Sequence, residues 1–349
     1  MPIPVVRKRT ENRNDPGGYN HAVRTGVARG EHPEPEGSPA RGCAADAEAG
    51  GRTAGNQEER NVALVSRDES CAAAAEELET AKADTSVAHS ARIWDYWLGG
   101  KDHFRADRVV GDAVLEAAPY VRDTTRAGRA FLASVVHHLT RDLGVRQFLD
   151  IGIGLPAASN THEVAQRAAP ESRIVYVDND PIVLAHARAL LTSTPEGVTA
   201  CIDADVRDTG RILTLAAKTL DFSQPVAVML LGILLFIPDA DDPWAITGQL
   251  MNALPAGSYL AVSHDASDIR AESAATASSR YNQYTPTAMR LRTAAEFSRF
   301  FDGLELIDPG VVPVNHWQPG PPPDTQMEEA LPAYAALARK PHPASQPAY

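Results

Sequence analysis

Glycines and acidic residues follow the expected strands of this chain in a pattern that suits a nucleotide ligand. The stretch QFLDIGIGLPAASN, from residue 147, reads as a buried strand followed by a G-x-G-x-x-A turn that starts at Gly152. Gly152 and Gly154 allow the backbone to turn sharply and to approach a ligand without a Cβ atom in the way. Amide groups of the helix that follows would then point at polar atoms of the ligand.

Two carboxylates extend this pattern. Asp178 lies 178 − 152 = 26 residues beyond Gly152, close to the spacing of about 20 residues expected for a carboxylate that binds ribose hydroxyls. Asp178 could instead cap the helix that begins near Pro181, but Asp180 is the better candidate for that cap. Asp205, after the third expected strand, could accept a hydrogen bond from an adenine amino group, or it could be an ordinary loop acid or helix cap.

The glycine turn alone would also fit a nicotinamide dinucleotide. That fingerprint requires no acid at the position of Asp205. Asp150 at the end of the first strand and Pro156 in the turn also disfavour a nicotinamide cofactor. The sequence therefore favours a different adenosine cofactor.

A candidate for proton transfer follows the fifth expected strand. His264 is the best-placed general base, with Asp265 beside it, if the reaction requires a base. The alternative is a histidine that bonds locally. The stretch HEVAQ at 162–166 begins like a zinc-binding helix, but Gln166 replaces the second histidine, so we predict no metal site.

Alternating elements must position these residues. Apolar strands separated by helices predict an α/β fold with a mostly parallel sheet and helices on both faces. We expect strands at 146–151, 173–178, 197–202, 226–231 and 257–263 and helices near 159–169, 181–192, 208–219, 243–253 and 293–303, followed by short strand-like pieces. Ligands bind such a sheet beyond the carboxyl ends of its strands.

The chain is predicted to have four parts. Residues 1–84 are poor in aromatic residues and are expected to be a disordered extension, as is the short tail 342–349. Residues 85–145 are expected to form an N-terminal helical cap, with helices that end at Gly99-Gly100, before Pro119 and at Gly144. Residues 146–341 are predicted to form the cofactor-binding domain.

Composition limits the possible partners. A net charge of −12 without a basic cluster argues against nucleic acid. The longest apolar run, 226–237, is too short to cross a membrane, and the N-terminus lacks the apolar core of a secretory signal. Three cysteines without metal-like spacing fit a reducing compartment, so we expect a cytoplasmic protein.

As a set, the motifs resemble one family. The chain resembles class I S-adenosylmethionine-dependent methyltransferases, and more narrowly the S-adenosyl methyltransferase family of actinobacteria, formerly a domain of unknown function. The resemblance covers about residues 86–340 and rests on ARIWDYWLGGKDHF, FLDIGIGLPAASNTHEVAQ, VYVDNDPIVLAHARALL, DADVRD, LLFIPDADDP, LPAGSYLAVSHDAS and EFSRFFDGLELIDPGVV.

The resemblance implies a Rossmann-like sheet of seven strands, the last antiparallel, that binds S-adenosylmethionine. Asp150, Gly152 and Gly154 would border the methionine part of the cofactor, and Asp178, with Asn179 next to it, would hold the ribose. The adenine would lie against Asp205 and Val206. The segment 99–104 would cover the cofactor site from the side of the N-terminal helices, with Arg92 and Tyr96 nearby. The resemblance implies Arg92, Tyr96 and Gly100 as cofactor-binding residues of this region.

Two departures from the family pattern bear on function. Ile153 stands where the family often has threonine, and Leu235 where it usually has histidine, which would remove a titratable group near the acceptor pocket. The predicted function is methyl transfer from S-adenosylmethionine to a small-molecule acceptor. The alternatives are a catalytically silent protein that binds the cofactor as a regulator and an NAD(P)-dependent oxidoreductase. The oligomeric state cannot be read from the sequence.

Overall fold

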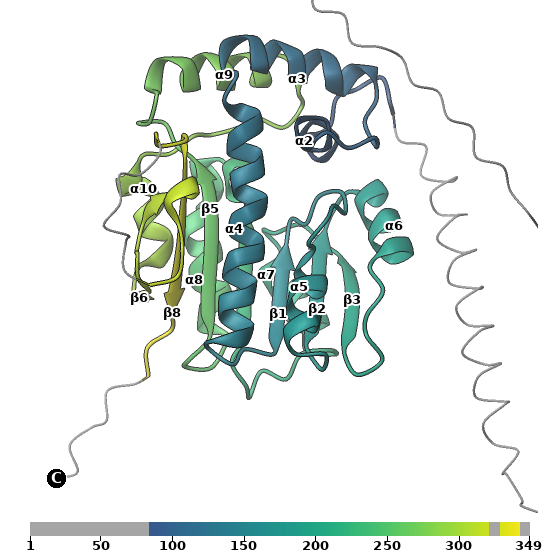
Figure 1. Cartoon of the computed structure of the whole chain (residues 1–349), viewed down its shortest axis with the longest axis vertical. Coiled ribbons are helices and arrows are strands. Elements are labelled where there is room, and N and C mark those ends of the chain that lie inside the picture. The colour runs from purple at the N-terminus through teal and green to yellow at the C-terminus, as the bar shows by residue number, and fades with distance from the viewer. Residues whose placement is uncertain (1–83, 321–328, 343–349) are drawn as a thin grey trace, which may run out of the picture. The chain divides into compact units, whose positions relative to one another are not determined.

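A mostly parallel sheet forms the centre of the fold. The computed structural model describes residues 84–320 and 329–342 (Figure 1). Nearly all of the two segments expected to be disordered, 1–84 and 342–349, lies outside them. The sheet order is β3-β2-β1-β4-β5-β8-β6, with β7 paired to β8. The strands are β1 (Gln147–Ile151), β2 (Arg173–Asp178), β3 (Val198–Asp203), β4 (Ala227–Leu231), β5 (Tyr259–Asp265), β6 (Glu305–Leu306), β7 (Val312–Pro313) and β8 (Ala333–Arg339).

The predicted fold class is confirmed, with one difference in strand number. Strands β1 to β5 pair in parallel, and β8 runs antiparallel to β5, as expected for the last strand. The described part of the chain has eight strands in its sheet and not seven. The difference arises because two strands of two residues each, β6 and β7, precede β8 and pair with it.

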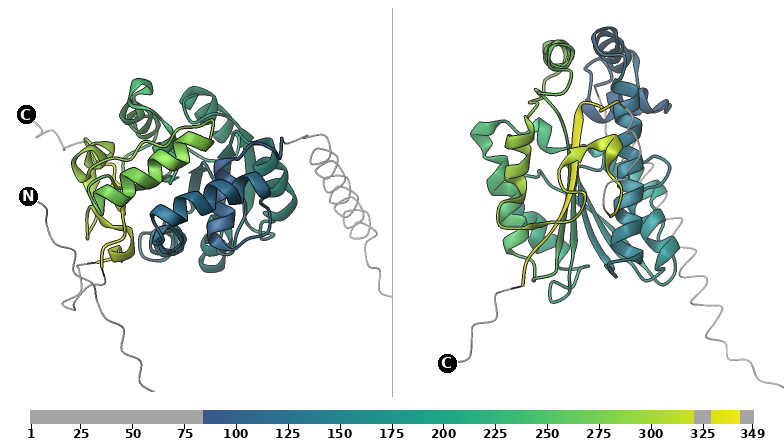
Figure 2. Two further views of the ribbon diagram at one scale, coloured as in Figure 1. Left: turned by 90° about the horizontal axis from the view of Figure 1, so that it is seen from above. Right: turned by 60° about the vertical axis from the view of Figure 1, so that its left-hand side comes forward.

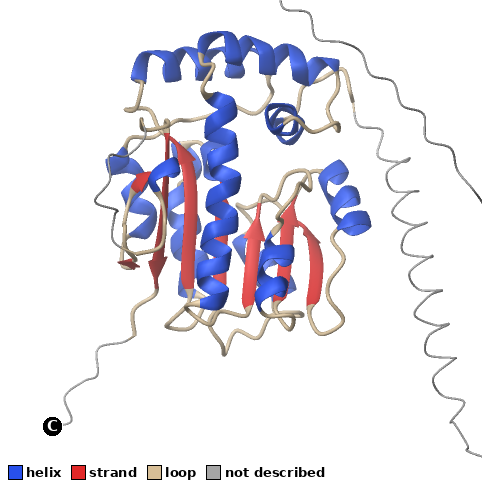
Figure 3. Cartoon of the chain, viewed as in Figure 1, coloured by secondary structure: helices blue, strands red, loops and turns tan. Residues whose placement is uncertain are grey.

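Helices cover both faces of the sheet (Figures 2 and 3). Successive strand residues such as Phe148 and Leu149 belong to two separate cores, because side chains alternate between the faces of a strand. One core includes residues of α4 (Val121–Arg141), α5 (Thr161–Ala168) and α6 (Pro181–Leu190). The other includes residues of α7 (Thr209–Ala216), α8 (Pro243–Asn252) and α10 (Ala294–Ser298).

A group of helices, which we call the cap, lies over the carboxyl ends of the parallel strands (Figure 1). It consists of α2 (Ser90–Leu98), α3 (Arg105–Ala117) and α9 (Ala271–Tyr284). The cap differs from the predicted 85–145 unit in two ways. The sequence analysis did not predict α9, and α4 packs against α5 and the sheet.

The cap has its own apolar core. Ile93 and Trp97 of α2 pack with Val114 of α3 and Tyr281 of α9. Leu235, which follows β4, is fully buried in the same cluster and ties the cap to the sheet. Among the described residues, no helix combines the length and the apolar character needed to cross a bilayer.

A buried ion pair joins α2 to α3. The Nε atom of Arg92 lies 3.0 Å from Oδ2 of Asp107, and both side chains are almost completely buried. The same carboxylate accepts backbone N–H groups of His89 and Phe104, so it also fixes the start of α3. Arg92 therefore holds the cap together from inside.

Arg92→Met is expected to destabilise the protein by about 3–5 kcal/mol, because it leaves the Asp107 carboxylate buried without a cation. Urea unfolding followed by circular dichroism measures this change. The matched control is Arg126→Met, which breaks the exposed pair with Asp123 and should change stability by about 0–1 kcal/mol. Equal effects of the two substitutions would contradict the structural role of Arg92.

Candidate functional site

A cavity of about 350 Å³ lies between the carboxyl edge of the sheet and the cap. It is the place where a ligand is expected in an open parallel sheet. Eight of the predicted site residues line it: Asp150, Gly152, Gly154, Asp178, Asn179, Asp205, Val206 and His264. The strand ends therefore bring together residues that are far apart in the sequence.

The glycine turn passes very close to the loop after β4. Gly152 has a φ of 76°, a conformation that favours glycine. A Cβ atom at this position would lie 2.6 Å from Cγ1 of Ile233. Gly154 also has a positive φ, of 63°, and its N–H donates to Oδ2 of Asp178 at 3.1 Å. Gly152 is therefore required for packing between β1 and β4, and Gly154 for the turn that faces the cavity.

Asp178 organises the adjacent turn. One of its carboxylate oxygens accepts the N–H of Gly154, and the other accepts the N–H groups of Asn179 and Asp180. The predicted cap of α6 is confirmed as Asp180, whose side chain accepts the N–H of Ile182. Burial raises the pKa of Asp178. Its carboxylate thus lines the cavity in a fixed orientation, as a ligand-binding carboxylate must.

The residues after β3 form the neighbouring wall. Asp205 accepts the backbone N–H of Arg207 at 2.9 Å and pairs with its guanidinium at 2.9 Å. The amide of Asn179 donates to the same carboxylate at 3.3 Å, which links the β2 and β3 ends. Val206 is buried beside them. This wall offers a carboxylate and an apolar surface next to each other.

Asp150 occupies the floor of the cavity. Its Oδ2 accepts the hydroxyl of Thr161 at 2.6 Å. Burial raises its pKa to about 6, and the nearby Arg129 opposes that rise. Arg129 itself donates to the carbonyl oxygen of Ala158. The Nε atom of Arg129 is buried and has no hydrogen-bond partner among the described residues.

His264 does not have a free ring nitrogen in this arrangement. The residue is 1% exposed and lies inside β5, which continues to Asp265. Its Nδ1 lies 2.8 Å from the carbonyl oxygen of Asp265, so Nδ1 carries the proton, and Nε2 accepts from Nη1 of Arg292 at 2.8 Å. Burial lowers the pKa of His264 to about 3. The structure gives no support to His264 as a general base.

Arg292 fixes this part of the site. Its buried guanidinium also donates to the carbonyl oxygens of Leu234 and Ile237 and to the carboxylate of Asp239. It therefore holds the end of β5 against the loop after β4. His264 and Arg292 act as positioning residues for that loop.

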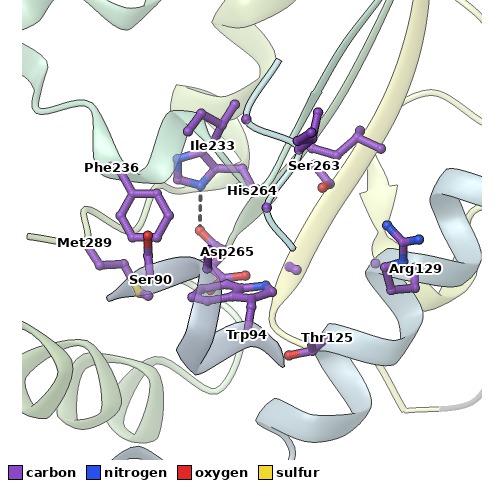
Figure 4. Close-up of a pocket in the computed structure, with 18 of the residues that line it drawn as sticks. Ser90, Trp94, Thr125, Arg129, Ile233, Phe236, Ser263, His264, Asp265 and Met289 are labelled. Carbon is purple, nitrogen blue, oxygen red and sulfur yellow. Dashed lines mark hydrogen bonds between the residues drawn. The ribbon is translucent and has the colours of Figure 1, made fainter. Parts of the chain in front are cut away.

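Asp265, which the sequence indicated only as the neighbour of His264, is the last residue of β5 and lines the cavity. Its partly buried side chain lines the cavity close to Trp94 (Figure 4). No hydrogen bond or ion pair of its carboxylate is found among the described residues. Burial raises its pKa to about 7. A carboxylate that titrates near neutral pH and faces a cavity is suited to binding or proton transfer.

Three predicted cofactor residues do not line this cavity. Arg92 is engaged with Asp107. Tyr96 donates its hydroxyl to Asp112 at 2.6 Å, and Gly100 donates its N–H to the carbonyl oxygen of Asp95 at the end of α2. Tyr96 and Gly100 border a separate shallow depression beside Arg122. The face of α2 that lines the cavity includes Ser90 and Trp94 and does not include Arg92 or Tyr96.

Leu235 also lies away from the cavity, in the cap core. Its neighbours Ile233 and Phe236 line the cavity instead. The expectation that residue 235 borders the acceptor pocket is therefore not supported in this chain.

The fold is a Rossmann-like α/β sheet, with a cavity at the carboxyl ends of β1, β2 and β3. A family model described as S-adenosyl methyltransferase matches residues 76–341. The chain belongs to this family, and its cofactor is S-adenosylmethionine. A search of curated proteins found no match.

Two solved structures from actinobacteria are similar over most of the chain. A DUF574 family protein from Streptomyces avermitilis is 46% identical, with a TM-score of 0.70; the match covers 74% of this chain and 99% of that one. A candidate methyltransferase from Thermobifida fusca is 36% identical, with a TM-score of 0.67, over 74% of this chain and 97% of that one.

Gly152→Ala is expected to destabilise the protein by about 1–3 kcal/mol and to weaken binding of S-adenosylhomocysteine, because the new Cβ meets Ile233 and the backbone is strained. Chemical unfolding and calorimetry measure the two effects. Gly210→Ala is the control: it lies on α7 with open space around the new Cβ. Unchanged stability and affinity in Gly152→Ala would contradict the packing argument.

Proposed function

We propose that this protein transfers the methyl group of S-adenosylmethionine to a small-molecule acceptor. The observation that carries this proposal is one continuous cavity, lined at the ends of β1, β2 and β3 by Asp150, Asp178 and Asp205. The same cavity extends past β4 to Asp265 and under the cap. It therefore offers room for a cofactor and for an acceptor next to it.

The residues present fit the cofactor. Asp178 would bind a ribose hydroxyl through Oδ2, since this oxygen accepts one N–H group, that of Gly154, and retains a lone-pair site, whereas Oδ1 already accepts two N–H groups. Asp205 and Val206 would contact the adenine. The buried Nε of Arg129, which lacks a partner among the described residues, would donate to the carboxylate of the methionine part. Arg129 lies close enough to Asp150 for its positive charge to oppose the rise in the pKa of Asp150.

When bound, the cofactor supplies an electrophilic methyl group on a sulfonium. The chain binds, orients and shields the reactants. The cap covers the cavity and excludes water, and the strand ends fix the donor side. Alignment of two reactants in this way can lower a barrier by about 7–11 kcal/mol at most.

Ligand preference separates this function from an oxidoreductase. S-adenosylhomocysteine should raise the melting temperature of the protein in a thermal-shift assay, whereas NADH should not, because the buried Asp150 carboxylate beside the glycine turn would repel the pyrophosphate of NADH. Stabilisation by NADH alone would reject the proposal.

Asp178→Asn tests the ribose contact. We expect a loss of about 1.5–3 kcal/mol of binding energy, or about 10- to 150-fold in affinity for S-adenosylhomocysteine, since the charge-assisted hydrogen bonds are weakened. Calorimetry measures the affinity, and circular dichroism checks that the variant is folded. Asp203→Asn is the matched control, because Asp203 is an exposed acid at the end of β3 that does not line the cavity. Equal affinities in a folded Asp178→Asn variant would refute the ribose assignment.

A further inference from the structure

No counter-charge for the Asp265 carboxylate is found among residues 84–320 and 329–342. Asp265 ends β5 and faces the cavity, and no ion pair or side-chain hydrogen bond of it is found in the part of the chain that the structure describes. Two arginines of the cavity and its support have other partners: Arg292 binds His264 and Asp239, and Arg129 donates to the carbonyl oxygen of Ala158. A partly buried carboxylate that faces a cavity and has no cation partner is a site at which a ligand can supply the positive charge.

Asp265 lies on the acceptor side of the cavity. The sheet order places β5 two strands away from β1, with β4 between them. Since neighbouring strands are about 4.8 Å apart, β5 is roughly 10 Å from β1 across the sheet, and the register puts Asp150 level with Ala261, so that Asp265 lies further along. Figure 4 shows Asp265 beside Trp94 and apart from Arg129. Asp265 is therefore separate from the residues that would hold the cofactor.

Aromatic and apolar side chains surround this end of the cavity. Trp94 of α2 and Phe236 contact each other with ring centroids 5.9 Å apart, and Tyr281 of α9 lies 6.2 Å from Phe236. Met289 completes the wall beside them (Figure 4). Such a wall accommodates an apolar body, and aromatic faces also attract a cation.

We propose that the methyl acceptor is an apolar molecule with a basic amine and that the Asp265 carboxylate binds this amine. The inference rests on the proposed function. Asp265 would hold the protonated amine by a charge-assisted hydrogen bond. It would then take one proton: an N–H bond breaks, an O–H bond forms on the carboxylate, and the electron pair stays on nitrogen as the lone pair that accepts the methyl group.

Two probes of equal size test the charge preference. The full chain, saturated with S-adenosylhomocysteine, is titrated in a calorimeter with 2-phenylethylamine and with 2-phenylethanol. We expect the wild type to bind the amine at least tenfold more tightly than the alcohol. Asp265→Asn should lose about 10- to 150-fold in affinity for the amine and less than about threefold for the alcohol.

The controls separate this proposal from the one on which it rests. Asp265→Asn should retain its affinity for S-adenosylhomocysteine. Asp123→Asn removes an exposed acid of α4 outside the cavity and should leave both probe affinities unchanged. If the wild type binds S-adenosylhomocysteine but does not bind the amine more tightly than the alcohol, the assignment of an amine acceptor is overturned, and the proposed methyltransferase function is not. Loss of S-adenosylhomocysteine affinity in Asp265→Asn also overturns it, because Asp265 would then serve the cofactor.

The pH dependence gives a second readout. Asp265 has a raised pKa of about 7, so the anion that attracts the amine is lost as the pH falls through 7. Amine affinity should drop about tenfold from pH 8 to pH 6 in the wild type and stay flat in Asp265→Asn. The other titratable or charged groups of the cavity and its support are His89, Asp95, Tyr120, Arg129, Asp150, Tyr176, Asp178, Asp205, Arg207, His264, Tyr281 and Arg292. An identical pH profile in both proteins would assign the titration to one of these and contradict the role of Asp265.

Discussion

The electrostatic cost of three carboxylates around one cavity is the constraint on which this structure depends. Asp150, Asp178 and Asp265 all have raised pKa values because burial penalises their charged forms. Arg129 offsets this only near Asp150. A cavity of this kind favours ligands that bring positive charge and hydrogen-bond donors. A sulfonium cofactor with ribose hydroxyls meets both requirements, and an amine acceptor would add a second positive charge at the far end.

The fold and the meeting of the strand-end residues at one cavity could be predicted because both follow from local rules. Apolar strands that alternate with helices indicate a parallel sheet, and parallel strands bring their carboxyl ends to one edge. Residues that directly follow a strand, such as Gly152 and Asp178, must then lie at that edge whatever the packing. The sequence also identified Asp180 as the cap of α6, because the Asp-Pro pair is a local signal.

The arrangement of the cap and the partners of the side chains at the end of β5 could not be predicted, because they depend on tertiary packing. Helix α9 buries mainly Ala274, Ala277 and Tyr281, a face too small to give a clear apolar period. The contact of α2 with α3 decides which face of α2 meets the cavity. Arg92 pairs with Asp107 of α3 and therefore does not line the cavity, contrary to expectation. The strand expected at 257–263 extends two residues further, to Asp265, so His264 lies within the sheet and Asp265 ends the strand at the cavity. Nε2 of His264 accepts a hydrogen bond from Arg292, which lies 28 residues away in the sequence. No local sequence pattern indicates this contact.

A crystal structure of the protein with S-adenosylhomocysteine tests the central claim most directly. The account predicts density for adenosine along the ends of β1, β2 and β3, with ribose oxygens within hydrogen-bond distance of Asp178. It also predicts the homocysteine carboxylate at Arg129 and an open space between the sulfur atom and Asp265. Density for the nucleoside elsewhere, or a sulfur atom turned away from Asp265, would contradict the account.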